Sequence, residues 1–121
     1  MTEPGKPKQY DLEDRTLAFA RDIRNFVRNL PHTMANVQDA RQLIRSSGSV
    51  GANYLEANQA VSRKDFVLRI KISRKEARES VYWLNLLDTG GRSACDSERR
   101  ELMQEAQELE KIFGAILRKV Q

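Results

Sequence analysis

The stretch SRKDFVLRIKISRKEARESVYWLNLL, residues 62–87, decides the fold of this chain. Its apolar and small residues recur at steps of three and four, so they share one face of a helix. Ser62 followed by Asp65 resembles a capping box with aspartate in place of glutamate, which predicts a helix start. The stretch therefore predicts one long amphipathic helix over about residues 62–88. Its expected inner face comprises Phe66, Ile70, Ser73, Ala77, Val81, Leu84 and Leu87.

Two further stretches, in which apolar residues also recur at steps of three and four, precede this helix in the sequence. One covers residues 11–30, with Asp11 or Asp14 available as the N-cap. It ends before Pro31, because the residue before a proline is disfavoured in the α region. The other covers residues 35–60. Both patterns predict amphipathic helices.

Two glycines, Gly48 and Gly51, lie in the middle of the second predicted helix. Each should cost the helix roughly 1 kcal/mol relative to alanine. Either the helix breaks near Gly48, or the small residues let a neighbouring helix approach closely. The close approach is favoured, because the apolar residues before Gly48 and those after Gly51 follow the same uninterrupted helical spacing. The expected inner stripe comprises Val37, Ala40, Ile44, Ser47, Gly51, Leu55 and Asn58, widened by Leu43, Val50 and Tyr54.

A loop and a fourth apolar pattern follow the third helix. The loop reads DTGGRSACD, in which Gly90 or Gly91 is expected to adopt the left-handed conformation beyond a helix end. Asp96 is expected to cap a fourth helix over residues 96–119. The apolar residues of this helix alternate four- and three-residue steps, as in a coiled-coil seam.

The whole chain of 121 residues fits one domain. Four helices with short connections predict an all-α fold, an antiparallel up-down four-helix bundle. The bundle is expected to cover residues 11–121. Residues 1–10 contain two prolines and a glycine, which predicts a flexible N-terminal tail.

The scarcity of reactive residues excludes several classes of protein. The single cysteine, Cys95, cannot form an internal disulfide, and with the single histidine, His32, it cannot form a usual zinc site. Ser49 has no base within a helical turn, so no activated nucleophile is expected. No run approaches the roughly 18 apolar residues of a membrane span, and no apolar secretory signal is expected. These observations predict a cytoplasmic protein that is not an enzyme and uses no metal, cofactor or membrane.

Positive charge is concentrated on the third predicted helix. Residues 61–80 contain seven Lys or Arg and three Asp or Glu, which equals the net charge of +4 for the whole chain. At about 100° per residue, six cations fall within one arc of the helix. This basic stripe is either an electrostatic surface for nucleic acid or a solvated helix face. Its members are Arg63, Lys64, Lys71, Arg74, Lys75 and Arg78.

The side opposite the inner face of the third helix carries a second apolar strip. Its members are Leu68, Ile72, Trp83 and Leu86. One helix of a bundle buries a single broad face inside its own bundle. Either Trp83 widens the inner face that packs in the core, or the strip is an interface between subunits. Exposed apolar patches often mark such interfaces. The subunit interface is favoured.

The motifs RSSGSVGANYLEA, residues 45–57, and EARESVYWLNLL, residues 76–87, resemble a known bacterial family. The chain is similar over about residues 12–119 to four-helix-bundle proteins encoded by intervening sequences of large-subunit ribosomal RNA genes. That family is in turn similar to the accessory variability determinant of diversity-generating retroelements. The matching positions are Arg45, Ser46, Ser49, Asn53, Glu56, Glu76, Glu79 and Trp83.

The resemblance implies a ring-like homopentamer with a positively charged surface. It also implies RNA or DNA, and a reverse transcriptase, as partners of the retroelement relatives. For the polar motif residues, an interhelical network of salt bridges and hydrogen bonds is the expected role. Two functions remain open: an oligomeric accessory module that binds nucleic acid, and an interaction scaffold that binds only protein.

Overall fold

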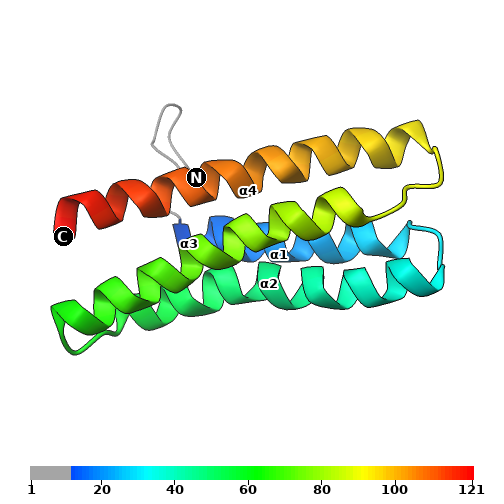
Figure 1. The fold of residues 1–121 in the computed structure, drawn as a ribbon. Coiled ribbons are helices and arrows are strands. Elements are labelled where there is room, and N and C mark those ends of the chain that lie inside the picture. Colours follow the sequence, from blue (N-terminus) through cyan, green and yellow to red (C-terminus); the bar gives the residue numbers. More distant parts are fainter. Residues whose placement is uncertain (1–11) are drawn as a thin grey trace.

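The computed structural model describes residues 12–121, which form four helices and no strand (Figure 1). Both the predicted tail and Asp11 lie outside the described residues. The helices are α1 (Leu12–Arg28), α2 (Met34–Asn58), α3 (Arg63–Leu86) and α4 (Ser93–Val120). The observed bounds agree within a few residues with the four predicted ranges. The all-α prediction is therefore confirmed.

The four helices pack as a bundle in which the backbone of each helix closely approaches two others. Among the described residues, these pairs are α1 with α2, α2 with α3, α3 with α4, and α1 with α4, as expected when antiparallel neighbours follow one another along the chain. Side chains also meet across one diagonal, where the Tyr54 ring of α2 packs against Phe113 of α4. A core of aromatic and aliphatic side chains fills the centre. The largest fully buried members are Phe19, Phe26, Phe113, Ile23, Leu43, Ile70, Leu84 and Leu109.

The helix ends confirm part of the capping predictions. The Ser62 hydroxyl accepts a hydrogen bond from the Asp65 backbone N–H at 3.0 Å, so the predicted cap of α3 is present. The prediction that Asp96 caps the fourth helix is wrong, because α4 begins at Ser93. Asp96 instead accepts a hydrogen bond from the Thr89 hydroxyl at 2.6 Å. Asp14, the other suggested cap of the first helix, lies within the first turn of α1.

The inner stripe of α2 is rotated from its predicted position. Val37, Leu55 and Asn58 are exposed, whereas Asn36 and Ser46 are buried. The Asn36 side chain donates to the backbone carbonyls of Pro31 and Asp88, at 2.8 Å each. Small polar residues that find hydrogen-bond partners can thus occupy core positions. Apolar periodicity alone does not reveal these buried polar residues.

Gly51 permits the close contact between α2 and α1, whereas Gly48 lies in open space. The helix α2 is continuous through both glycines, so the break near Gly48 is excluded. A Cβ at position 51 would lie 2.8 Å from Oγ1 of Thr16 on α1. A Cβ at position 48 would meet only Arg24, at 3.8 Å. The interpretation of a close helix approach is confirmed for Gly51.

Alanine substitutions at these two glycines should have opposite effects on stability. Gly51→Ala should lower the free energy of unfolding by about 1–3 kcal/mol, the usual cost of overpacking, because Thr16 is buried and cannot move away. Gly48→Ala should raise it by up to about 1 kcal/mol through helix propensity. Urea unfolding at one protein concentration measures both changes. Equal effects of the two substitutions would contradict this explanation.

Gly90 and Gly91 both adopt positive φ, at 69° and 75°, in the loop between α3 and α4. The left-handed conformation predicted for one of them is therefore present in both. None of the helices within residues 12–121 is long and apolar enough to cross a membrane.

Candidate functional site

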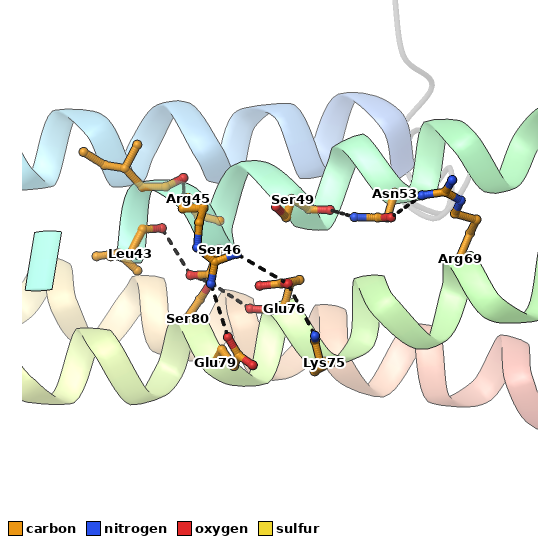
Figure 2. A network of polar contacts seen from close by, with 12 residues as sticks. Leu43, Arg45, Ser46, Ser49, Asn53, Arg69, Lys75, Glu76, Glu79 and Ser80 are labelled. Carbon is orange, nitrogen blue, oxygen red and sulfur yellow. Dashed lines mark hydrogen bonds and ion pairs between the residues drawn. The ribbon is translucent and has the colours of Figure 1, made fainter. Parts of the chain in front are cut away.

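A cluster of ion pairs joins α2 and α3 near the middle of both helices (Figure 2). The Arg45 guanidinium of α2 lies 3.8 Å from a carboxylate oxygen of Glu76 and 3.6 Å from one of Glu79, both on α3. The Lys75 ammonium lies 3.8 Å from the same Glu76 oxygen. Glu76 is only 5% exposed, and a buried charge requires such partners. The two cations therefore balance a carboxylate within the α2–α3 contact.

Hydrogen bonds between buried hydroxyl groups lie beside the ion pairs. The hydroxyl oxygens of Ser46 and Ser80 are 2.9 Å apart. Each hydroxyl also lies within hydrogen-bond distance of a backbone carbonyl of its own helix, Ser46 of Leu43 at 3.3 Å and Ser80 of Glu76 at 2.9 Å. Since a hydroxyl carries a single hydrogen, either serine can be the donor between the two helices. This contact fixes the register between α2 and α3.

The polar contacts continue along α2 toward its C-terminus. The Asn53 side chain donates to the Ser49 carbonyl at 2.9 Å and accepts from Arg69 of α3 at 3.0 Å. Ser49 thus contributes through its backbone. Glu56 is exposed, and its side chain forms no hydrogen bond or ion pair within residues 12–121. Of the polar motif residues, Glu56 is therefore the one that lies outside the α2–α3 network.

Two buried polar atoms on α3 have no hydrogen-bond partner in the described part of the chain. They are Oε1 of Glu76 and Nε1 of Trp83. The two residues are seven positions apart and so lie on one side of the helix. Leaving such an atom unsatisfied costs roughly 1–3 kcal/mol. This side of α3 lacks a donor for the carboxylate and an acceptor for the indole.

The side chains of the predicted apolar strip, which includes Trp83, are exposed or half-buried. Leu68 and Leu86 are 54% and 49% exposed, and Ile72 and Trp83 are half-buried. Trp83 also packs against the core, as one of the two sequence interpretations expects. Leu68 and Leu86 have no such role. We call Leu68, Ile72, Trp83 and Leu86 the α3 apolar strip.

All six cations of the basic stripe are exposed on α3. Two of them have carboxylate partners: Lys75 lies near Glu76, and Arg78 lies 3.1 Å from Glu110 of α4. The other four form no ion pair with any described residue. These four unpaired cations are Arg63, Lys64, Lys71 and Arg74.

Two grooves follow the stripe where α3 and α4 meet. The first has a volume of about 700 Å³ and is lined by Arg63, Lys64, Val67, Leu68, Lys71, Val120 and Gln121. The second, which we call the Arg74 groove, has a volume of about 470 Å³. It is lined by Arg74, Gln107, Glu110, Lys111, Gly114 and Arg118. The pattern of a single helix does not reveal that its α4 cations, Lys111 and Arg118, lie beside Arg74 of α3.

Tyr82 of α3 is 59% exposed. It lies one turn beyond Arg78 and so next to it on the same helix face. Its ring meets that of Trp83 edge-on, with centroids 5.1 Å apart. Tyr54, by contrast, packs against Phe113 at 5.8 Å. The basic stripe therefore includes one aromatic ring that is accessible for stacking.

Acidic side chains gather on the opposite side of α4, facing α1. A groove there is lined by Arg15 and the carboxylates Asp22, Glu98, Glu101 and Glu105. Arg15 binds Glu105 through two hydrogen bonds of 2.7 and 2.8 Å. Burial raises the pKa of Glu98, and the neighbouring charges of Asp22 and Glu101 raise it further. A polyanion would thus be repelled from this side and attracted to α3.

The remaining reactive residues form no cluster suited to chemistry. The Cys95 thiol is buried and donates to the backbone carbonyl of Asn29 at 3.7 Å. His32 is exposed in the loop between α1 and α2. No group of three or more His, Cys, Asp or Glu residues within residues 12–121 is arranged to hold a metal ion.

Comparisons with known proteins find a matching family model and four matching chains of solved structures. The model of the 23S rRNA-intervening sequence protein family matches residues 8–115. One of the solved structures, at 1.70 Å, is of a protein with unknown function from the S23 ribosomal protein family of Bacteroides thetaiotaomicron VPI-5482. It is 33% identical, with a TM-score of 0.74, and the match covers 87% of this chain and 96% of that chain. A search of curated proteins gave no match.

Proposed function

Because this chain belongs to the 23S rRNA-intervening sequence protein family, we propose that it is a non-enzymatic, oligomeric accessory protein that binds RNA or single-stranded DNA. The proposed contact surface is the basic stripe of α3, and the proposed location is the cytoplasm. The proposal rests on one observation. Four cations of the basic stripe are exposed and have no carboxylate partner among the described residues: Arg63, Lys64, Lys71 and Arg74. Such cations are available to phosphates, which dominate nucleic-acid affinity.

The position of Lys64 supports a role beyond helix stability. Arg63 and Lys64 lie in the first turn of α3, where the helix macrodipole disfavours positive charge. Arg63 donates a hydrogen bond to the backbone carbonyl of Val120 at the C-terminal end of α4, which accounts for its position. Lys64 has no such partner among the described residues, so helix stabilisation does not explain its position.

Exposed Tyr82 supports a preference for single strands. Base stacking on an aromatic ring requires an unpaired base and tolerates any sequence. Contacts to phosphates likewise carry no sequence information. We therefore expect weakly selective binding to single-stranded RNA or DNA.

Self-association through the α3 apolar strip is the second part of the proposal. Leu68 and Leu86, 54% and 49% exposed, offer apolar area to a neighbouring subunit. The favoured stoichiometry, a pentameric ring, derives from the family resemblance. A ring repeats the basic stripe and increases affinity through avidity without any new contact.

The alternative function is an interaction scaffold without a nucleic-acid role, favoured by the same exposed strip. A protein partner, such as a reverse transcriptase, would then dock on the oligomer. Salt dependence distinguishes the two functions, because phosphate contacts weaken steeply with salt and an apolar docking surface does not.

Fluorescence anisotropy with a labelled single-stranded RNA of mixed sequence tests the proposal. Four phosphate contacts predict a slope of about −3 in a plot of log affinity against log salt concentration. A single protomer should bind at about 10⁻⁴–10⁻⁶ M, and an oligomer more tightly. Absence of binding to both RNA and single-stranded DNA at about 50 mM salt would refute the nucleic-acid role and favour the scaffold.

A further inference from the structure

The Arg74 groove brings together cations from two helices that are distant in sequence. Arg74 comes from α3, whereas Lys111 and Arg118 come from α4. All three are exposed, and none forms an ion pair with a residue in the described part of the chain. The one carboxylate in the groove, Glu110, lies 3.1 Å from Arg78 and is thereby balanced. Three positive charges thus remain without compensation.

Gly114 provides the space in which two of these cations meet. A Cβ at position 114 would lie 3.6 Å from Nη1 of Arg118 and 3.9 Å from Nε of Arg74. The two guanidinium groups therefore approach the same small volume from different helices. Like charges repel at such distances. An anion placed between them would remove this repulsion.

We propose that the Arg74 groove is a binding site for a backbone phosphate of single-stranded RNA, a proposal that rests on the function proposed above. Guanidinium groups form paired, charge-assisted hydrogen bonds with phosphate oxygens. Lys111 adds a third positive charge, and the amide of Gln107 adds a neutral donor. The glycine keeps the floor of the groove low, so a phosphate reaches both guanidinium groups. The main contact surface then extends from α3 across to α4.

Two variants test the groove by independent means. The double substitution Lys111→Gln with Arg118→Gln removes the two α4 charges and leaves the α3 stripe intact. Gly114→Leu fills the groove without any change of charge. The matched control is Arg21→Gln with Arg41→Gln, which removes two exposed, unpaired cations from α1 and α2. Circular dichroism and thermal melting verify that each variant is folded.

The readout is anisotropy of a labelled single-stranded RNA of mixed sequence over a salt series. Both groove variants should weaken binding about tenfold or more, and the control should have little effect. Loss of two phosphate contacts should also reduce the magnitude of the salt slope by about 1.4 in the double variant. Gly114→Leu should weaken binding although its net charge is that of the wild type.

Three other outcomes would overturn the proposal and are distinguishable from one another. Equal weakening by the double variant and its control would show that binding follows net charge, so the groove is refuted while nucleic-acid binding stands. Full affinity of a folded Gly114→Leu protein would show that no phosphate enters the groove. Absence of binding by the wild type would refute the groove together with the proposed function.

Discussion

Simultaneous replacement of Lys64, Lys71 and Arg74 by glutamate should abolish binding to single-stranded RNA. The three side chains are exposed and lack ion-pair partners among the described residues, so the substitutions break no salt bridge of the fold. Each removes an attractive contact with a phosphate and adds a repulsive one. Because affinity depends steeply on the number of phosphate contacts, a loss of at least roughly 100-fold is expected at about 100 mM salt. Arg78 is left unchanged, since it balances Glu110 of α4.

The control for this charge reversal is the triple substitution of Arg21, Arg28 and Arg41 by glutamate. These arginines are also exposed and form no ion pair within the described residues, but they lie on α1 and α2. Both triple variants change the net charge by the same amount. Anisotropy titrations should therefore show a large loss only for the α3 variant. Equal losses would indicate attraction by net charge alone and would contradict a defined surface on α3.

Substitution of both Leu68 and Leu86 by glutamate should dissociate the proposed oligomer into monomers. Each leucine is about half exposed and absent from the core, so a charge at either position costs the protomer little. In an apolar interface the same charges would be buried without partners, which is strongly unfavourable. Light scattering on a size-exclusion peak should show the mass fall to the 13.9 kDa of one chain. Trp83 is less suitable for this test, because it also packs against the core.

Leu17 and Leu55 provide a matched control for the α3 apolar strip. Both are 49% exposed, but they lie on α1 and α2. The double variant Leu17→Glu with Leu55→Glu should keep the mass of the wild type. A wild type that is monomeric at tens of micromolar would contradict self-association, and dissociation by the control variant alone would place the interface elsewhere. A stable wild-type dimer would contradict only the pentamer.

Much of the candidate site could be identified from one helix, because a single helix carries the necessary pattern. The arc of cations and the apolar strip both follow from the 100° rotation per residue. The α4 part of the basic surface could not be identified in this way. Lys111 and Arg118 reach Arg74 only because α3 and α4 are neighbours in the bundle. The exposure of Tyr82 could not be identified either, since its sequence position does not reveal whether another helix covers it.

The sequence by itself determined the number, length and order of the helices in the described chain. Pro31, the Ser62 cap and the two glycines at 90 and 91 act on the local backbone, and apolar periodicity sets each amphipathic face. Tertiary structure decided which residues of α2 are buried and where charges from separate helices meet. Asn36 and Ser46 each have one hydrogen-bond partner that is distant in sequence, Asp88 for Asn36 and Ser80 for Ser46, and no local pattern contains those two partners. Local conformational preference therefore fixed the elements, whereas contacts between distant segments fixed the buried polar network and the surface that we propose for phosphate.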